Sequence, residues 1–87
     1  MLELIRNELN ILGNENATVF FFDNVFNVRV DDFPEDCELP EALAIDNFYD
    51  FLIINCDYYE IDSKYPTYMN YYFADGLMVH IGTNNDL

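Results

Sequence analysis

At 87 residues the chain is long enough for one domain and too short for two, since independent domains usually need on the order of 100 residues each. Its 17 Asp and Glu residues against three Lys and Arg residues give a formal net charge of −14, which excludes direct binding to nucleic-acid phosphates or to anionic membranes. A hydrophobic content of 52%, with eight Phe and seven Tyr, excludes a disordered acidic tail, because such tails are poor in aromatic residues.

Residues 2–12 have the apolar spacing of an amphipathic helix. Ile5, Leu9 and Leu12 recur at helical intervals, and polar residues occupy many of the positions between them. Gly13 follows directly, and glycine is typical of the position just after a helix. The sequence therefore predicts a helix over residues 2–12 that ends at Gly13.

Two strands joined by a tight turn are predicted next. In Val25–Val30 the polar residues Asn27 and Arg29 alternate with apolar ones, which is the period of a half-buried strand. Thr18–Asp23 forms the partner strand, and the Asp23-Asn24 pair favours a tight hairpin turn. We expect an antiparallel hairpin here.

An acidic segment precedes the second predicted helix. Residues 31–38 are expected to form a loop, and Pro40 suits the first turn of the helix that follows. Apolar residues then recur at helical spacing toward Asn55, the predicted end of the helix. Phe51–Ile54 could equally be a strand.

The last third of the chain reads as antiparallel strands. Tyr58–Asp62 is a short strand, and residues 64–66 turn the chain. Thr67–Phe73 is then predicted to pair with Leu77–Gly82 across Ala74-Asp75-Gly76, a strong hairpin signal.

These elements predict a single acidic α+β domain over residues 1–87, an antiparallel sheet of about four to five strands with two helices. The N-terminus shows neither the basic nor the apolar region of a signal peptide, and no apolar run approaches the roughly 18 residues of a membrane span. We therefore expect a cytoplasmic protein in which Cys37 and Cys56 are free, buried thiols.

The negative charge is concentrated in one part of the chain. Residues 31–62 contain eleven acids and no Lys or Arg, so they carry −11, whereas the other 55 residues carry −3. On a helix, Asp46, Asp50 and Asp57 would lie within about 40° of each other at about 100° per residue. Ordinary soluble surfaces mix both signs, so this asymmetry predicts an acidic face for a basic partner.

Tyrosines interleave with these acids and could supply short-range contacts to Arg side chains. The predicted partner-binding residues are Asp31, Asp32, Glu35, Asp36, Glu38, Glu41, Asp46, Asp50, Asp57, Tyr58, Tyr59, Glu60 and Asp62.

In its small size, extreme acidity and α+β pattern, the chain resembles the DNA-mimic proteins of phages and plasmids. That class includes anti-CRISPR proteins, anti-restriction proteins and uracil-DNA glycosylase inhibitors. The resemblance implies a non-catalytic inhibitor that blocks the basic DNA- or RNA-binding groove of another protein in a bacterial host cell. Immunity proteins and antitoxins that plug the active site of a cognate nuclease look similar by the same criteria, so they are the alternative. Both a monomer and a dimer remain open at this point.

The sequence contains only weak signals for catalysis or metal binding. Asp62-Ser63-Lys64 is a literal D-x-K, the carboxylate–lysine pattern of restriction-type nucleases, but a three-residue match in so acidic a chain predicts no catalytic site. The acids of residues 31–36 lack the pattern of a dedicated calcium loop. His80 lies far in sequence from the single Ser and is expected at a strand surface or partly buried. We predict no enzyme activity, no metal site and no cofactor.

Overall fold

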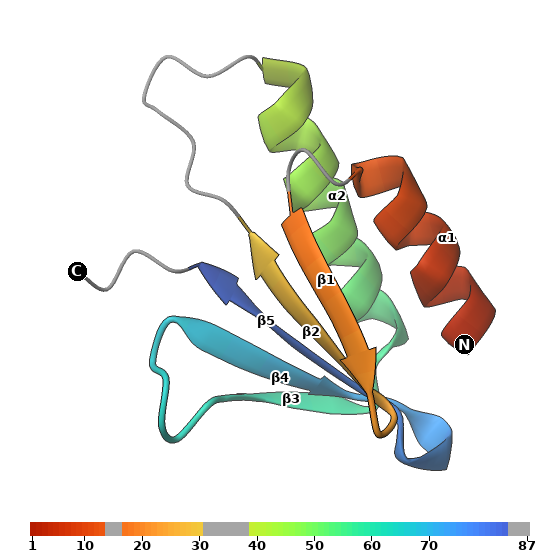
Figure 1. Cartoon of the computed structure of the whole chain (residues 1–87), viewed down its shortest axis with the longest axis vertical. Coiled ribbons are helices and arrows are strands. Elements are labelled where there is room, and N and C mark those ends of the chain that lie inside the picture. The colour runs from red at the N-terminus through yellow and green to blue at the C-terminus, as the bar shows by residue number, and fades with distance from the viewer. Residues whose placement is uncertain (14–16, 31–38, 84–87) are drawn as a thin grey trace.

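The computed structural model describes residues 1–13, 17–30 and 39–83, and for residues 39–44 it describes the backbone alone. Two helices lie on the same side of a five-stranded sheet, as Figure 1 shows. The elements in chain order are α1 (Leu2–Leu12), β1 (Ala17–Phe22), β2 (Val25–Val30), α2 (Leu39–Asn55), β3 (Tyr58–Ile61), β4 (Tyr68–Tyr72), a short 3₁₀ turn η1 (Ala74–Gly76) and β5 (Met78–Thr83).

The sheet has the strand order β1-β2-β5-β4-β3. Three of its strand pairs are antiparallel, but β2 and β5 run parallel, with Val25 opposite Met78 and Val30 opposite Thr83. The α+β class predicted from the sequence is confirmed, and the sheet is mixed where we expected a wholly antiparallel one. The parallel pair joins the N-terminal hairpin to the C-terminal strands, and the segment between them contains α2.

The local predictions in the N-terminal half are confirmed. Helix α1 ends at Gly13, whose φ of 86° lies in the left-handed region and whose N–H donates to the Leu9 carbonyl oxygen at 3.0 Å. The turn between β1 and β2 has φ of 54° at Asp23 and 63° at Asn24, the two positive values of a type I′ hairpin. The predicted loop over residues 31–38 lies outside the described residues.

The second half shows one correction in helix α2. Phe51–Ile54 belongs to α2, which continues to Asn55, so the strand alternative was wrong. The predicted C-terminal hairpin is confirmed, with β4 and β5 joined through η1, where Asp75 and Gly76 both have positive φ.

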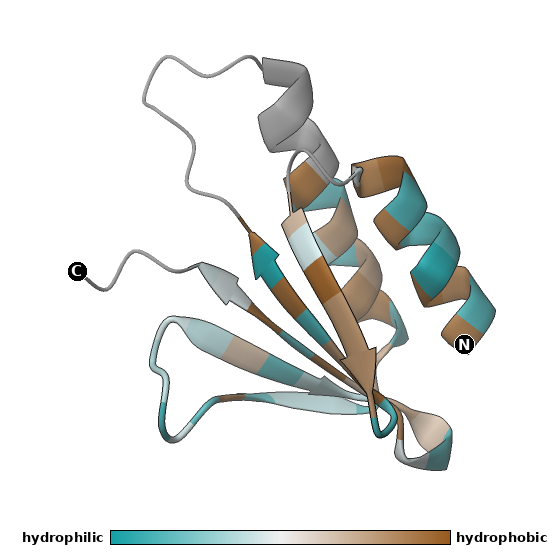
Figure 2. Ribbon diagram, viewed as in Figure 1, coloured by the Kyte–Doolittle hydropathy of each residue, from teal (hydrophilic) through white to brown (hydrophobic). Residues whose placement is uncertain are grey.

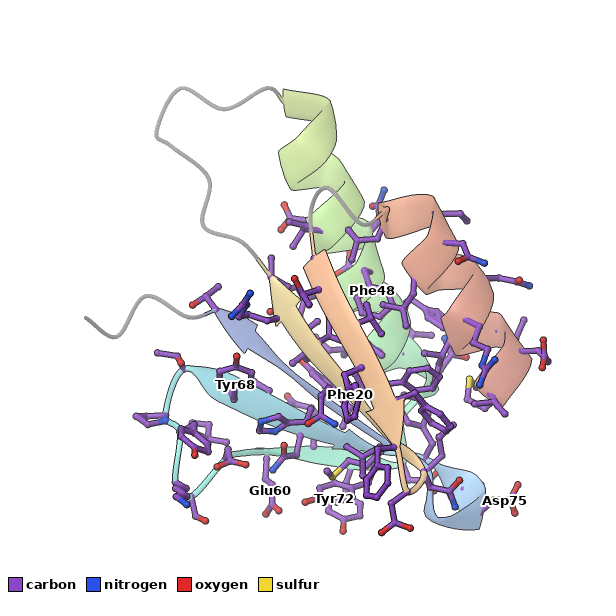
Figure 3. All side chains as sticks on the ribbon, viewed as in Figure 1. Phe20, Phe48, Glu60, Tyr68, Tyr72 and Asp75 are labelled. Carbon is purple, nitrogen blue, oxygen red and sulfur yellow. The ribbon has the colours of Figure 1, made fainter. Side chains whose placement is uncertain are left out.

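The core lies between the helices and one face of the sheet. Ile5 and Leu52 are fully buried, Phe48 is 2% exposed, and Val79 and Ile81 meet them from the centre of the sheet. Figure 3 shows Phe48 between α2 and the strands. The predicted alternation in β2 is confirmed, since its even-numbered residues are buried on this face. Figure 2 shows strongly apolar positions on β1, β2 and β5, whereas β3 and β4 are mostly paler, with tyrosines and polar residues.

Candidate binding surface

The opposite face of the sheet is not covered by a helix in the described part of the chain (Figure 1). Side chains on alternate positions of each strand point to this face. We call it the open face and define it by Thr18, Phe20, Phe22, Val25, Asn27, Arg29, Tyr58, Glu60, Tyr68, Asn70, Tyr72, Met78, His80 and Gly82. Aromatic and polar residues dominate it, so this face differs in chemistry from the aliphatic core.

A hydrogen-bonded network occupies the centre of the open face. Asn70 Nδ2 donates to Asp62 Oδ2 at 3.1 Å, and Asn70 Oδ1 lies 2.6 Å from His80 Nδ1. An ionised carboxylate only accepts hydrogen bonds, so the Asn70 amide nitrogen faces Asp62 and its oxygen faces the histidine. His80 Nδ1 must therefore carry the proton, and it also lies 3.5 Å from Asp62 Oδ2. The network fixes both the orientation and the tautomer of His80.

The other oxygen of Asp62 closes the turn after β3. Asp62 Oδ1 accepts hydrogen bonds from the backbone N–H groups of Lys64 at 2.8 Å and Tyr65 at 2.9 Å. The hydrogen bonds to Asp62 hold the pKa of its carboxyl below the ordinary value. The bond from the Lys64 N–H has the largest effect, followed by the bond from Asn70. The D-x-K match is thus a turn cap, and the Lys64 ammonium lies over the Tyr65 ring, 5.6 Å from its centre. Within the described ranges, no three His, Cys, Asp or Glu side chains gather as metal ligands would.

Replacing Asp62 with asparagine should lower stability at neutral pH, because the substituted amide cannot accept both from the turn and from Asn70. The folded-state pKa of Asp62 lies below the unfolded value of 3.8. Its stabilising contribution is therefore present above that value and is lost as the pH falls through the lower folded-state pKa. Urea midpoints of Asp62→Asn and the parent should differ at neutral pH and converge at an acidic pH below the folded-state pKa of Asp62.

Asp57→Asn is the matched control, since it removes the same charge from an exposed position where no side-chain hydrogen bond is present among the described residues. Its urea midpoint should follow the parent at both pH values. A gap for Asp62→Asn that stays constant with pH would contradict the role assigned to the carboxylate.

Stacked rings flank the network on both sides. Tyr68 stacks on His80 with ring centres 4.6 Å apart and an interplanar angle of 14°. Tyr58 stacks on Tyr72 at 4.5 Å and 13°. Tyr72 Oη donates to Glu60 Oε1 at 2.8 Å, and this bond raises the pKa of the Tyr72 hydroxyl. The open face is therefore a pre-organised surface of rings held by polar contacts.

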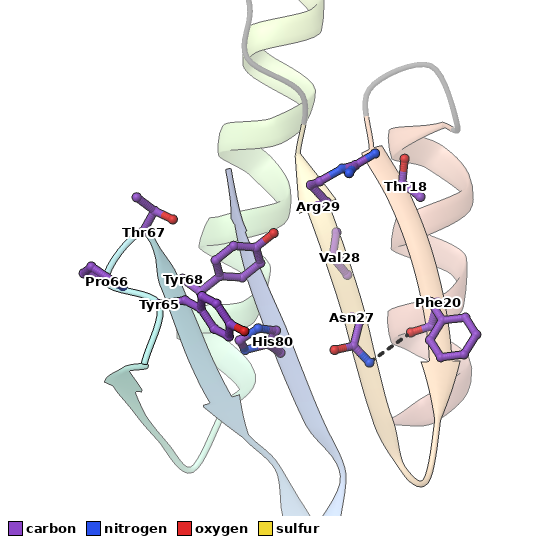
Figure 4. A pocket seen from close by; sticks show the side chains of 10 residues that line it. All are labelled: Thr18, Phe20, Asn27, Val28, Arg29, Tyr65, Pro66, Thr67, Tyr68 and His80. Atoms are coloured by element: carbon purple, nitrogen blue, oxygen red, sulfur yellow. Dashed lines mark hydrogen bonds between the residues drawn. The ribbon is translucent and has the colours of Figure 1, made fainter. Parts of the chain in front are cut away.

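A pocket of about 430 Å³ lies on the open face beside this network. Figure 4 shows its lining, with Tyr65, Tyr68 and His80 on one side and Arg29, Asn27 and Phe20 on the other. Asn27 Nδ2 donates to the Phe20 carbonyl oxygen at 3.4 Å. The remaining lining residues are Thr18, Val28, Pro66 and Thr67.

The predicted acidic residues do not all come to one side of the sheet. Asp46 and Asp50 are exposed on α2, on the helix side. Glu60 lies on the open face, and Asp62 follows β3 and bonds into the open-face network. The prediction that Asp57 aligns with the helical acids was wrong, because α2 ends at Asn55 and the Asp57 N–H donates to the Tyr72 carbonyl oxygen.

The other predicted contact residues divide as follows. Tyr58 is 58% exposed on the open face, and Tyr59 is 51% exposed on the helix side, where it packs against Tyr71. Asp31, Asp32, Glu35, Asp36 and Glu38 lie outside the described residues, and of Glu41 only the backbone is described.

The acids of the described part have no cationic side chain to neutralise them. No Lys or Arg there lies within ion-pair distance of a carboxylate, and His80 with Asp62 is the single contact of that kind. Arg6 instead lies over the Phe21 ring, 5.3 Å from its centre. The uncompensated charge is therefore a property of the folded surface as well as of the composition.

Sequence reasoning missed the pocket and its network. Arg29 and His80 belong to segments far apart in the sequence, and Asn70 belongs to no recognised motif. The alternation of Tyr68, Asn70 and Tyr72 was a usable signal, because it placed one polar residue between two rings on one strand face.

Comparison with protein-family models, with curated proteins and with solved structures finds no significant match to the chain. Among the described residues no helix has the length and apolar character needed to cross a membrane.

Cys56 is a free, half-buried thiol whose pKa is raised by burial, and Cys37 lies outside the described residues.

Proposed function

We propose that the protein is a non-catalytic binding inhibitor that presents negative charge to the basic nucleic-acid-binding surface of another protein in the host cytoplasm. The observation that carries the proposal is the absence of any Lys or Arg partner for a carboxylate among the described residues of a chain with a net charge of −14. Such a surface disfavours folding through self-repulsion, and a basic partner would relieve that repulsion on binding. A CRISPR effector or another defence nuclease has the required basic groove.

The folded scaffold supports this proposal. Asp46 and Asp50 stand one helical turn apart on the exposed side of α2, where residues four apart have Cβ atoms about 5–6 Å from each other. Their backbone is already ordered, so a partner that pairs with them does not have to order a flexible tail. We infer that the main contact is made by this side of α2.

The test measures binding to a CRISPR effector complex, a restriction endonuclease and a uracil-DNA glycosylase, each with and without duplex DNA as competitor. We expect at least one of them to bind, DNA to compete, and the dissociation constant to rise about tenfold or more between low and moderate salt, since charge pairing is screened. Asp46→Lys with Asp50→Lys should weaken that binding about tenfold or more.

Glu3→Lys with Glu8→Lys is the matched control, because it changes the net charge equally on α1. Equal losses for the two double variants would contradict the location on α2. Binding that ignores both salt and DNA would contradict nucleic-acid mimicry and would favour the alternative, an immunity protein fitted to one nuclease active site. Failure to bind any of the three proteins would contradict the proposed target class.

A further inference from the structure

The pocket on the open face has a charge opposite to that of the rest of the chain. Acids occupy 17 of 87 positions, about one in five, yet none of the ten lining residues is acidic. The lining instead includes Arg29, one of only three Lys and Arg residues in the sequence, and His80. A ligand for this pocket therefore differs in kind from the basic partner proposed above.

Arg29 is available to an anion. It is exposed on β2, and no carboxylate of the described residues lies within ion-pair distance of it. A guanidinium presents paired N–H donors that match a carboxylate or a phosphate, and it keeps its charge throughout the physiological range. In so acidic a chain, an arginine with no carboxylate partner among the described residues makes the pocket beside it a favourable place for an anion.

His80 offers a second fixed polar group. Its Nδ1 proton is committed to Asn70, so Nε2 is the ring nitrogen left for another partner. No hydrogen bond to Nε2 is present among the described residues, and every fully buried side-chain nitrogen and oxygen there has a partner, so Nε2 is not fully buried. The His80 side chain is 18% exposed. Asp62 and Asn70 hold the ring from behind, and the stacked Tyr68 holds it from one face.

Aromatic rings form the walls of the pocket. Tyr65 meets Tyr68 edge-on at 6.2 Å and 63°, and it meets His80 edge-on at 6.5 Å and 68°. Phe20, which is 63% exposed, lies on the opposite side of the pocket. Rings set at such angles suit a flat molecule, which can stack on one ring and meet the edge of another.

From these observations we propose that the pocket binds a small, flat aromatic molecule that carries one anionic group. The anion pairs with Arg29, the ring system lies among Phe20, Tyr65 and Tyr68, and His80 Nε2 contributes a hydrogen bond. A volume of about 430 Å³ falls within the range of ligand pockets, which run from about 300 to 1,000 Å³ and combine apolar walls with a few placed polar groups. This inference does not depend on the proposed inhibitor function.

The test titrates the whole protein with naphthalene-2-carboxylate and follows the NMR resonances of the backbone and of the His80 ring. We expect saturable shifts at Arg29, Tyr68 and His80. 2-Naphthamide, which has the same shape without the charge, and cyclohexanecarboxylate, which has the charge without the flat ring, should each bind about tenfold more weakly. A naphthyl phosphate that binds more tightly than the carboxylate would identify the anion as a phosphate.

Arg29→Gln should weaken naphthalene-2-carboxylate binding about tenfold and leave 2-naphthamide binding unchanged. Arg6→Gln is the matched control, since it removes the same charge from α1 on the helix side of the sheet. Equal losses for the two variants would show a diffuse charge effect and would overturn the proposal. Shifts that map to the helix side, or no saturable binding at millimolar concentration, would also overturn it.

Discussion

Replacing Phe48 with alanine should lower the free energy of unfolding by about 3–5 kcal/mol, the largest effect we expect from a single substitution in this chain. Phe48 is 2% exposed, and its ring lies in α2 near that of Phe51, with centres 6.5 Å apart. Truncation removes buried apolar area and leaves a cavity that the surrounding side chains can fill only in part. Small domains have about 5–15 kcal/mol in total, so this variant should be only marginally folded.

Urea denaturation followed by circular dichroism measures the effect. Because the chain carries −14, added salt should screen its self-repulsion and raise the midpoints of the parent and of Phe48→Ala together. Phe22→Ala is the control, since Phe22 is 67% exposed and its loss should change stability by no more than about 0.5 kcal/mol. Similar losses for the two substitutions would contradict the placement of the core on the helix side.

The elements themselves could be predicted because each depends on signals close together in the sequence. Helix α1 is predicted by signals that all lie within its own residues, namely the spacing of Ile5, Leu9 and Leu12 and the glycine that follows. All three apolar side chains are buried, as that spacing requires. Asp23-Asn24 forms its turn because both residues tolerate positive φ. Helix α2 was less certain at Phe51–Ile54 because a short apolar run fits either structure, and burial of Leu52 against the sheet decides for the helix.

The pairing of distant strands could not be predicted in the same way. Nothing local to Val25–Val30 or Met78–Thr83 specifies that they run parallel, since alternation fixes which residues face inward and not which strand lies alongside. The candidate binding surface depends on that pairing. His80 lies between Asn27 and Asn70 only because β5 is inserted between β2 and β4.

The acidic surface shows the same limit. The concentration of acidic residues in residues 31–62 can be counted in the sequence, but the face of the molecule on which each acidic side chain lies cannot. A strand sends successive side chains to opposite sides, and β3 places Glu60 on the open face while α2 holds Asp46 on the other. Counting acids along the chain therefore predicts the total negative charge of the surface. Which face of the molecule carries each acid is determined by the fold.

Gly82→Ala should destabilise the protein by about 1–3 kcal/mol and disturb the pocket at the same time. A Cβ atom at Gly82 would lie 2.5 Å from the Thr67 carbonyl oxygen, 2.6 Å from Tyr68 Cγ and 2.8 Å from Tyr68 Cα. Two of these three atoms belong to the backbone of β4 or the turn before it, so a side-chain rotation cannot relieve the crowding. The Tyr68 ring lies over Gly82, and displacing it should also break the stack with His80.

Two companion variants separate the ring from the backbone in this prediction. Tyr68→Ala removes one of the three close atoms, so Gly82→Ala should be less destabilising in that background, yet still unfavourable because the backbone contacts remain. Gly76→Asn is the control, since nothing lies within 4 Å of a Cβ there and asparagine tolerates its φ of 76°. Thermal unfolding measures stability, and the NMR shifts of the His80 ring report the stack. A Gly82→Ala variant with unchanged stability and an unchanged His80 signal would contradict the close approach of β4 to β5 on which the pocket wall depends.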